Sequence, residues 1–497
     1  MIRIVGCIAL TCAGLSAQQR PALPFRPEIP RVWQSAALEN LEVPVSQPAY
    51  SPKPVPEDYY YRIPVLPIYK SYPVYAPGRV PPGYMEKLKQ LAPELAFNPA
   101  RLRTKEEWIR AGEAVFDASA TYGTDVSMED LADPEWYAAT GVQVAKDGTV
   151  PWVRYVIRGT GNVEVGNLSC GFCHTRVLPD GSVIKGAQGN FAFDTAIAFR
   201  NRKRVEPAEV RSTFLSLFTV QWQPTVQKRL EEMSAEEINS VHAAIPPGVF
   251  ARNRSSPFYP PAIPDLIGVK DRKYLDRSGA TVNRGMTSLM LYASMAQGIE
   301  FLSNFGGFIP LGEENFTKLP PPETQARLSD EQLYALALYL YSLKPPPNPN
   351  RLDGLADAGR KVFERQGCAG CHPPPVYTNN KLLPAQGFKI PAEHQSKYDI
   401  LDVPIGTDPR LTMLTRRGTG YYKVPSLRGV WYRGPFEHNG SVATLEDWFD
   451  ERRLRDDFAP TGFKGYNVST RAVKGHEFGL KLSSDEKHAL IAFLKTL

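Results

Sequence analysis

Two short stretches of the chain place two cysteines three positions apart, with a histidine directly after the second. They are CGFCH, from Cys170 to His174, and CAGCH, from Cys368 to His372. Two thiols at this spacing can form thioethers with the vinyl groups on one edge of a porphyrin, and the adjacent histidine can then bind the iron. The alternative is zinc, but each stretch offers only three ligands where structural zinc takes four. The two copies therefore predict two covalently attached c-type haems.

The residues of the two motifs are expected to divide into two roles. The four thiols would hold the porphyrins, and the two histidines would be the proximal iron ligands. The thiols are those of Cys170, Cys173, Cys368 and Cys371, and the histidines are His174 and His372.

The first 17 residues, MIRIVGCIALTCAGLSA, have the features of a secretory signal. Arg3 supplies the positive charge, an apolar run follows, and small residues precede a cleavage site after Ala17. A retained anchor fits less well, because the run is shorter than the roughly 20 residues that span a bilayer. A lipoprotein site at Cys12 also fits less well, because Thr11 precedes it. We expect a periplasmic or secreted protein with no membrane span after cleavage.

Composition and charge describe a folded protein that does not bind nucleic acid. Hydrophobic residues make up 42% of the 497, which is typical of a globular chain. The formal net charge is +6, but the basic residues are interspersed and form no dense patch. No nucleic-acid partner is therefore expected, and an acidic redox protein is a candidate partner.

Proline-rich segments divide the chain. Residues 18–100 are rich in proline and tyrosine, which excludes long helices. A disordered linker is one interpretation of this segment. The many Tyr, Val, Ile and Leu residues favour the other, an ordered extended arm that wraps a domain surface. A second proline-rich stretch, 345–351, is the clearest linker between domains.

Internal repeats predict the fold class. AGEAVF at 111–116 matches AGRKVF at 358–363, and the apolar helical pattern at 328–343 matches that at 482–497. A glycine four residues before a phenylalanine suits a helix that crosses the terminal helix of a cytochrome c domain at close range. We therefore expect a mainly α fold with two tandem cytochrome c-like domains, 101–344 and 352–497, the first enlarged by insertions.

The repeat also bears on the second axial ligand of each iron. His476 lies seven residues before Ser483, and an offset of 154 places Pro322 at the matching position of the first domain. Proline cannot bind iron, so the second haem is expected to have two histidines and the first an open position. Met286, Met290 and Met295 are alternative ligands for the first haem, although their spacing favours a helix stripe that faces the core. His242, His394 and His488 have polar neighbours and are expected to be solvated.

The segment 421–449 resembles the signature of bacterial di-haem cytochrome c peroxidases and MauG-type enzymes. The specific parts are PFEHNGS and the following TLEDW, and this residue pattern is most similar to that of the rubber oxygenase branch. The resemblance covers nearly all of the second domain and, more loosely, the first. It implies a reactive N-terminal haem, a bis-histidine C-terminal haem with His476 as distal ligand, and a role for His438 between the haems. His438 could instead fix its loop through a hydrogen bond. The chain is shorter than the known rubber oxygenases and lacks a clear counterpart of their aromatic substrate pocket, so no particular substrate is implied.

Two functions of different classes remain open. In the first, the chain is a di-haem peroxidase or haem-dependent oxygenase that takes peroxide or dioxygen and an apolar organic substrate, with Trp431 or Tyr432 easing electron passage between haems. In the second, it is an electron-transfer cytochrome without a substrate, which requires a second ligand on both irons. The long insertions, from Phe116 to Cys170 and from Arg176 to Leu328, favour the enzyme, because an electron carrier has no evident need for them.

Overall fold

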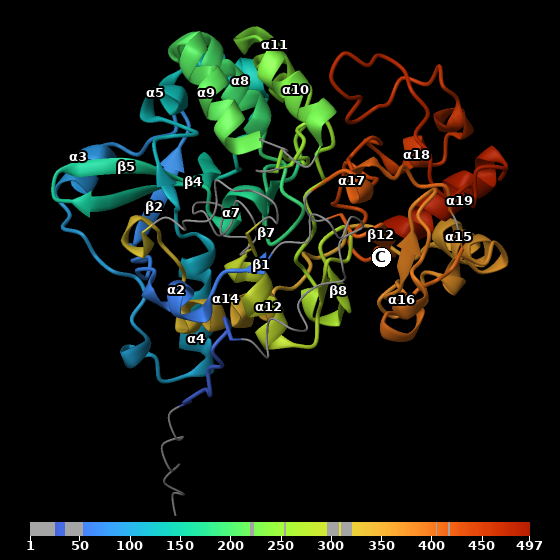
Figure 1. Ribbon diagram of the computed structural model, residues 1–497, viewed down its shortest axis with the longest axis horizontal. Helices are drawn as coiled ribbons and strands as arrows, with labels where there is room; N and C mark the ends of the chain where they lie inside the picture. The colour runs from blue at the N-terminus through green and yellow to red at the C-terminus, as the bar shows by residue number, and fades with distance from the viewer. Residues whose placement is uncertain are drawn as a thin grey trace, which may run out of the picture.

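The computed structural model describes residues 25–34, 53–218, 223–252, 255–295, 308–309, 321–403, 405–415 and 418–497. The predicted signal, 1–17, lies outside these residues. Helices dominate the described chain, in agreement with the expected mainly α fold. Figure 1 shows the second region, residues 352–497 in orange and red, beside the first region, residues 101–344 in blue to yellow.

The first region is organised around the crossing of helices α4 (Lys105–Phe116) and α14 (Asp330–Ser342). Each helix begins with a capping box, formed by Thr104 and Glu107 in one and by Ser329 and Gln332 in the other. At the crossing a Cβ on Gly112 would lie 1.9 Å from the carbonyl oxygen of Ala335. Only glycine permits this approach.

The second region repeats the same contact with helices α15 (Gly354–Arg365) and α19 (Ser484–Lys495). A Cβ on Gly359 would lie 1.8 Å from the carbonyl oxygen of Ala489. The rings beside the two crossings also match: Phe116 and Tyr339 have centroids 5.3 Å apart, and Phe363 and Phe493 have the same separation. Ala489 and Phe493 follow Ala335 and Tyr339 by 154 positions (489 − 335 and 493 − 339), the offset used for the repeat.

Three strands of the insertion before the first motif and one strand of the proline-rich arm form a sheet that was not predicted. Its four antiparallel strands run in the order β2-β4-β5-β3, and β4 and β5 are joined by a tight turn at Thr160 and Gly161. The strands are β2 (Ser71–Tyr75), β3 (Thr121–Tyr122), β4 (Thr149–Gly159) and β5 (Asn162–Asn167). One face of this sheet packs on Phe172, which lies within the first motif.

The longer insertion after the first motif is helical and covers one end of the region in Figure 1. These helices enclose an apolar cluster of their own. Among the described residues, the α-helices of both insertions are α5 (Met128–Ala132), α6 (Pro134–Thr140), α8 (Phe193–Arg204), α9 (Pro207–Phe218), α10 (Pro224–Glu232), α11 (Ala235–Ala243) and α12 (Met286–Ser294).

The described parts of the proline-rich arm pack into the core of the first region. They form only short helices, α2 (Glu57–Arg62) and α3 (Tyr84–Lys89), as the proline content requires. Trp33 is fully buried, stacks on Tyr60 at 4.8 Å between centroids, and donates from Nε1 to the carbonyl of Val55 (2.8 Å). These segments therefore supply core residues and do more than cover a surface.

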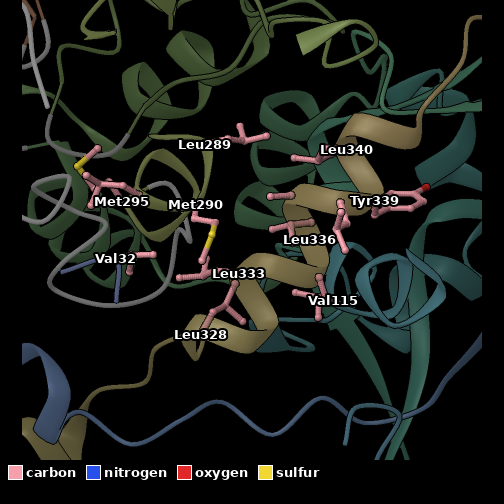
Figure 2. Packing of buried hydrophobic residues seen from close by; sticks show 14 of the residues in the cluster. Val32, Val115, Leu289, Met290, Met295, Leu328, Leu333, Leu336, Tyr339 and Leu340 are labelled. Carbon is pink, nitrogen blue, oxygen red and sulfur yellow. The ribbon is translucent and has the colours of Figure 1, made fainter. Parts of the chain in front are cut away.

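Helix α12 (Met286–Ser294) lies against α14. Figure 2 shows Met290 directed toward α14, among Leu333 and Leu336. Met290 and Met295 are buried in this apolar cluster, and Met286 packs against it. The methionine stripe therefore faces the core, as its spacing favours.

The remaining elements are short. They are η2 (Pro99–Arg101), α7 (Cys170–Cys173), β6 (Thr175–Val177), β7 (Val183–Lys185), η3 (Val269–Asp271), β8 (Tyr274–Leu275), β9 (Thr281–Val282), η5 (Pro322–Thr324), η6 (Cys368–Gly370), β11 (Leu382–Pro384), α16 (Ala392–Lys397), α17 (Arg410–Met413), β12 (Tyr421–Lys423), α18 (Leu445–Trp448) and η7 (Glu451–Leu454), and β1 (Lys53–Pro54) pairs with β10 (Phe308–Ile309). Within the described ranges, no helix combines the length and the apolar character needed to cross a membrane.

Candidate haem-binding site

The first motif forms a single helical turn, α7, between strands β5 and β6. Ser169 caps this turn by accepting from the Phe172 amide (3.0 Å), and the His174 amide donates to the carbonyl of Cys170 (2.9 Å). The turn therefore brings both cysteines and the histidine together. The ring of Phe172 packs between Phe191 and Phe193, at centroid distances of 4.8 and 5.2 Å, and so anchors the turn in the core.

The second motif has the same backbone closure. The His372 amide donates to the carbonyl of Cys368 (2.9 Å), the distance found in the first motif. Cys368 and Ala369 pack against the apolar cluster that contains Phe363 and Phe493, so this motif lies beside the α15–α19 crossing. The number of residues between the repeated phenylalanine and the first cysteine differs greatly between the two copies. The backbone hydrogen bond that closes the motif is nevertheless the same.

The histidines of both motifs are oriented by a backbone carbonyl. Nδ1 of His174 lies 3.0 Å from the carbonyl oxygen of Pro264, and Nδ1 of His372 lies 3.1 Å from that of Tyr377. A proton on Nδ1 completes each bond and leaves Nε2 as a free electron-pair donor, the arrangement usual for a histidine that binds a metal. Burial lowers the pKa of His174 to about 4 and also lowers that of His372, so both rings are in the neutral, ligating form at neutral pH.

The donor set fits covalently bound haem. All four cysteines are free thiols, and burial raises the pKa values of Cys170 and Cys173 to about 12. They are thus protonated and apolar, which suits thioether formation with a porphyrin and disfavours a thiolate site. Across the described residues, no group of three or more His, Cys, Asp or Glu side chains gathers as a metal cage. The residues at each motif would hold a haem by two thioethers and one imidazole.

His476 is half-buried and lies on a separate loop of the second region. Its pKa is lowered to about 4, first by burial and then by its electrostatic interaction with His372. Its Nδ1 is buried and has no hydrogen-bond partner among the described residues. The ring packs edge-on against Trp448 at 5.3 Å. A neutral imidazole with a free ring nitrogen has the chemistry of an axial haem ligand.

Arg453 holds the loop that carries His476. No pattern in the amino-acid sequence indicated this role. The side chain is fully buried and donates to the carbonyls of Trp448 (2.9 Å), Val473 (2.8 Å) and His476 (2.6 Å). A buried charge with three backbone acceptors fixes the path of the backbone on both sides of the histidine.

Replacing Arg453 by methionine is expected to lower the free energy of unfolding by about 3 kcal/mol, because three backbone carbonyls lose a charged donor. Chemical denaturation of the purified protein measures this loss. Arg452→Met is the control: its side chain is 76% exposed and pairs only with Asp450, so a change within about 0.5 kcal/mol is expected. Equal effects of the two substitutions would show that Arg453 does not hold the loop.

His438 lies in a tight loop and is buried. Its Nδ1 lies 2.9 Å from Oε2 of Glu437, its ring packs on Tyr422 at 4.7 Å, and its carbonyl accepts from the amide of Ala262 (2.8 Å). Burial would raise the pKa of Glu437, but the hydrogen bond and charge of His438 hold it below its ordinary value. A Cβ on Gly475 would lie 2.6 Å from Oε1 of Glu437, so this pair also borders the His476 loop. These contacts match the loop-fixing interpretation of His438, and its catalytic role stays a prediction.

The loop that contains His438 also joins the two regions. Arg176, two residues after His174, donates to the carbonyl of Gly434 (2.9 Å), and Gln188 donates to that of Pro435 (2.9 Å). The Tyr432 hydroxyl donates to Asp265 (3.1 Å), next to the carbonyl that orients His174. The second region is therefore fastened directly to the backbone around the first motif.

Two of the three histidines expected to be solvated are not. His242 is 4% exposed and its Nδ1 lies 2.7 Å from Asp194, while His394 is 5% exposed and bonds to the hydroxyl of Tyr421 (2.9 Å). The prediction was wrong because it weighed only sequence neighbours, and the partners come from distant segments. His488 is exposed, as expected.

Comparisons with known proteins give distant likenesses. No family model matches the chain. An uncharacterized protein, y4iJ, of Sinorhizobium fredii is 27% identical, over 31% of this chain and 41% of that protein, so the chain spans less than half of that relative. Hydrazine synthase of Kuenenia stuttgartiensis has 14% identity and a TM-score of 0.31, over 59% of this chain and 94% of that one. A MauG-like protein associated with microbial copper homeostasis has 17% identity and a TM-score of 0.28, over 48% of this chain and 73% of that one. Neither score establishes a shared fold.

Proposed function

We propose that the chain is an exported di-haem c-type oxidoreductase with two tandem cytochrome c-like domains. The haem at Cys170–His174 would activate peroxide or dioxygen, and the haem at Cys368–His372 would relay electrons. The observation that carries this proposal is an asymmetry between two otherwise matched regions. His476, a half-buried histidine, precedes the terminal helix of the second region, and the corresponding position of the first region is a proline.

The match rests on contacts in both regions. Gly112 meets Ala335 as Gly359 meets Ala489, so the offset of 154 between the terminal helices corresponds to equivalent positions in space. The same offset relates His476 to Pro322, which begins the short helix η5. Because proline has no side-chain donor atom, the first haem would keep its face opposite His174 free for a small oxidant.

The residues of the chain would prepare the two haems for different tasks. A bound haem supplies the redox chemistry of its iron. At the first motif, the Pro264 carbonyl fixes the orientation of His174, and the apolar packing of Phe172 excludes water from that side. In the second region, Arg453 fixes the backbone of the loop that carries His476, so that this histidine would be held in place as the second ligand. Trp431 and Tyr432, with rings 5.2 Å apart, stand at the junction of the regions as candidates for electron passage.

We also propose that the chain is a member of the peroxidase and MauG superfamily and of its rubber oxygenase branch. It would lie in the periplasm or be secreted, act on an apolar organic substrate and exchange electrons with a redox partner protein. The competing function is an electron-transfer cytochrome with no substrate, which would require a second ligand on the first iron. The burial of Met290 and Met295 in an apolar cluster favours the enzyme, because it gives these methionines a packing role.

Electron paramagnetic resonance of the oxidised protein distinguishes the two functions. The enzyme is expected to show one high-spin ferric haem beside one low-spin bis-histidine haem, and the reduced protein is expected to bind carbon monoxide at the first haem. Two low-spin signals without carbon monoxide binding would establish the electron carrier and overturn the enzyme.

A further inference from the structure

A cavity of about 40 Å³ lies between the two cysteine–histidine motifs. On one side its wall includes Pro264, whose carbonyl orients His174. On the other side it includes Pro425 and Thr378, the residue that follows the carbonyl orienting His372. The cavity therefore touches the backbone behind both proximal histidines and has room for a few water-sized groups.

Four basic side chains line this cavity: Arg272, Arg277, Lys423 and Arg433. They come from both regions of the chain, two from the 272–277 segment and two from the 423–433 segment. All four are half-buried. Asp265 is the only carboxylate in the same wall. Its oxygens accept from the Tyr432 hydroxyl (3.1 Å) and from the Ile267 amide (3.1 Å), both neutral donors.

The hydrogen bonds of the four cations go to backbone carbonyls. Arg277 donates to two carbonyls at 3.0 Å, Arg433 to two at 2.9 Å, Arg272 to two in the 265–267 segment, and Lys423 to one at 3.3 Å. In the described part of the chain, none of the four forms an ion pair with a carboxylate. Asp276 and Glu437 also act on Arg277, but they pair with Arg252 and His438, so the four cations of the wall outnumber the one carboxylate beside them, Asp265.

The four cations also lie close enough to repel one another. Burial lowers the pKa of Lys423 well below its usual value, and the charges of Arg272 and Arg277 lower it further. Burial, followed by the charges of Arg433 and Arg272, lowers the pKa of Arg277 to about 10. Like charges gathered away from water are unfavourable unless anions accompany them.

We propose that this cavity is an anion site that takes carboxylate or oxyanion groups, and that the propionate carboxylates of the two haems are its occupants. The inference rests on the proposed function, because it requires haem at both motifs. Each haem brings two carboxylates, and those that reach the cavity would meet the four cations of its wall. The site would then hold both haems by the same set of charges and raise their potentials together, because a nearby cation favours the reduced, less positive haem.

Spectroelectrochemical titration of the full-length holoprotein tests the proposal. Lys423→Gln and Arg433→Gln each remove one charge from the cavity and are expected to lower the midpoint potentials of both haems, with or without added phosphate. Arg433→Lys, which keeps the charge, is expected to restore the wild-type values. Arg428→Gln is the control, since this arginine is on the same loop but exposed and directed to Asp271.

The outcomes separate the sources of the anion. Potentials that depend on added phosphate in the wild type, and lose this dependence in the variants, would support an anion site and overturn the propionates as its occupants. Unchanged potentials in both glutamine variants, with no phosphate dependence, would overturn the anion site. Haem content, measured on the same samples as the pyridine haemochrome, distinguishes this failure from failure of the proposed function. Two haems with unchanged potentials would contradict only the anion site. A protein without haem would contradict both the anion site and the proposed function.

Discussion

Replacing His476 by alanine is expected to abolish the low-spin signal of the second haem and to convert that haem to a high-spin form. The covalent bonds through Cys368 and Cys371 and the proximal His372 remain, so haem content should be unchanged while one axial ligand is lost. The oxidised variant would then show two high-spin haems by electron paramagnetic resonance. The reduced wild type is expected to bind carbon monoxide at one haem, and the reduced variant at both haems.

The structure provides the reason for so large an effect. His476 is half-buried with its Nδ1 enclosed, its pKa is lowered to about 4 so that the ring is neutral, and Arg453 donates to its backbone carbonyl (2.6 Å). His488→Ala is the matched control, because that histidine is exposed on α19 in the same region. A His476→Ala protein that keeps its low-spin signal would show that another residue binds the second iron.

Replacing Gly359 by alanine is expected to destabilise the second region by about 3 kcal/mol or more. The added Cβ would lie 1.8 Å from the carbonyl oxygen of Ala489 and 2.9 Å from Cβ of Phe493, so α15 and α19 must move apart. This loss outweighs the gain of roughly 1 kcal/mol that alanine brings to a helix. Urea denaturation followed by the absorbance of the second haem measures it.

Gly354→Ala, at the first residue of the same helix, has nothing within 4 Å of the added Cβ and should leave stability unchanged or slightly raised. Gly112→Ala should act on the first region as Gly359→Ala acts on the second, because its Cβ would lie 1.9 Å from the carbonyl oxygen of Ala335. If Gly359→Ala were as stable as Gly354→Ala, the close crossing of the helices would be wrong.

The helix crossings could be predicted from sequence because local patterns specify them. In the Gly-x-x-x-Phe repeat, both residues lie on one face of a helix, about one turn apart, and the Ser-initiated apolar patterns predict the helices that cross it. Gly112 and Gly359 occupy the predicted close contacts. The sheet was missed because β4 is buried along most of its length and shows little alternation. The run VPWVRYVI followed by a Thr-Gly turn was the signal that could have indicated a hairpin.

The side chains that position the site could not be predicted, because their partners are far apart in the chain. Arg453 acts on a loop 20 residues away, and Pro264 orients a histidine 90 positions before it. Lys423 and Arg272 meet in one cavity from different regions. Sequence spacing indicates which residues can do chemistry, but the hydrogen bonds that orient them appear only when distant segments fold together.

Intact-mass spectrometry of the exported protein tests the central claim most directly. The wild type is expected to carry the mass of two haems through denaturation, and the variants Cys170→Ser/Cys173→Ser and Cys368→Ser/Cys371→Ser are expected to carry one each. A wild-type mass without added haem would contradict the assignment of both motifs, and with it the proposed function.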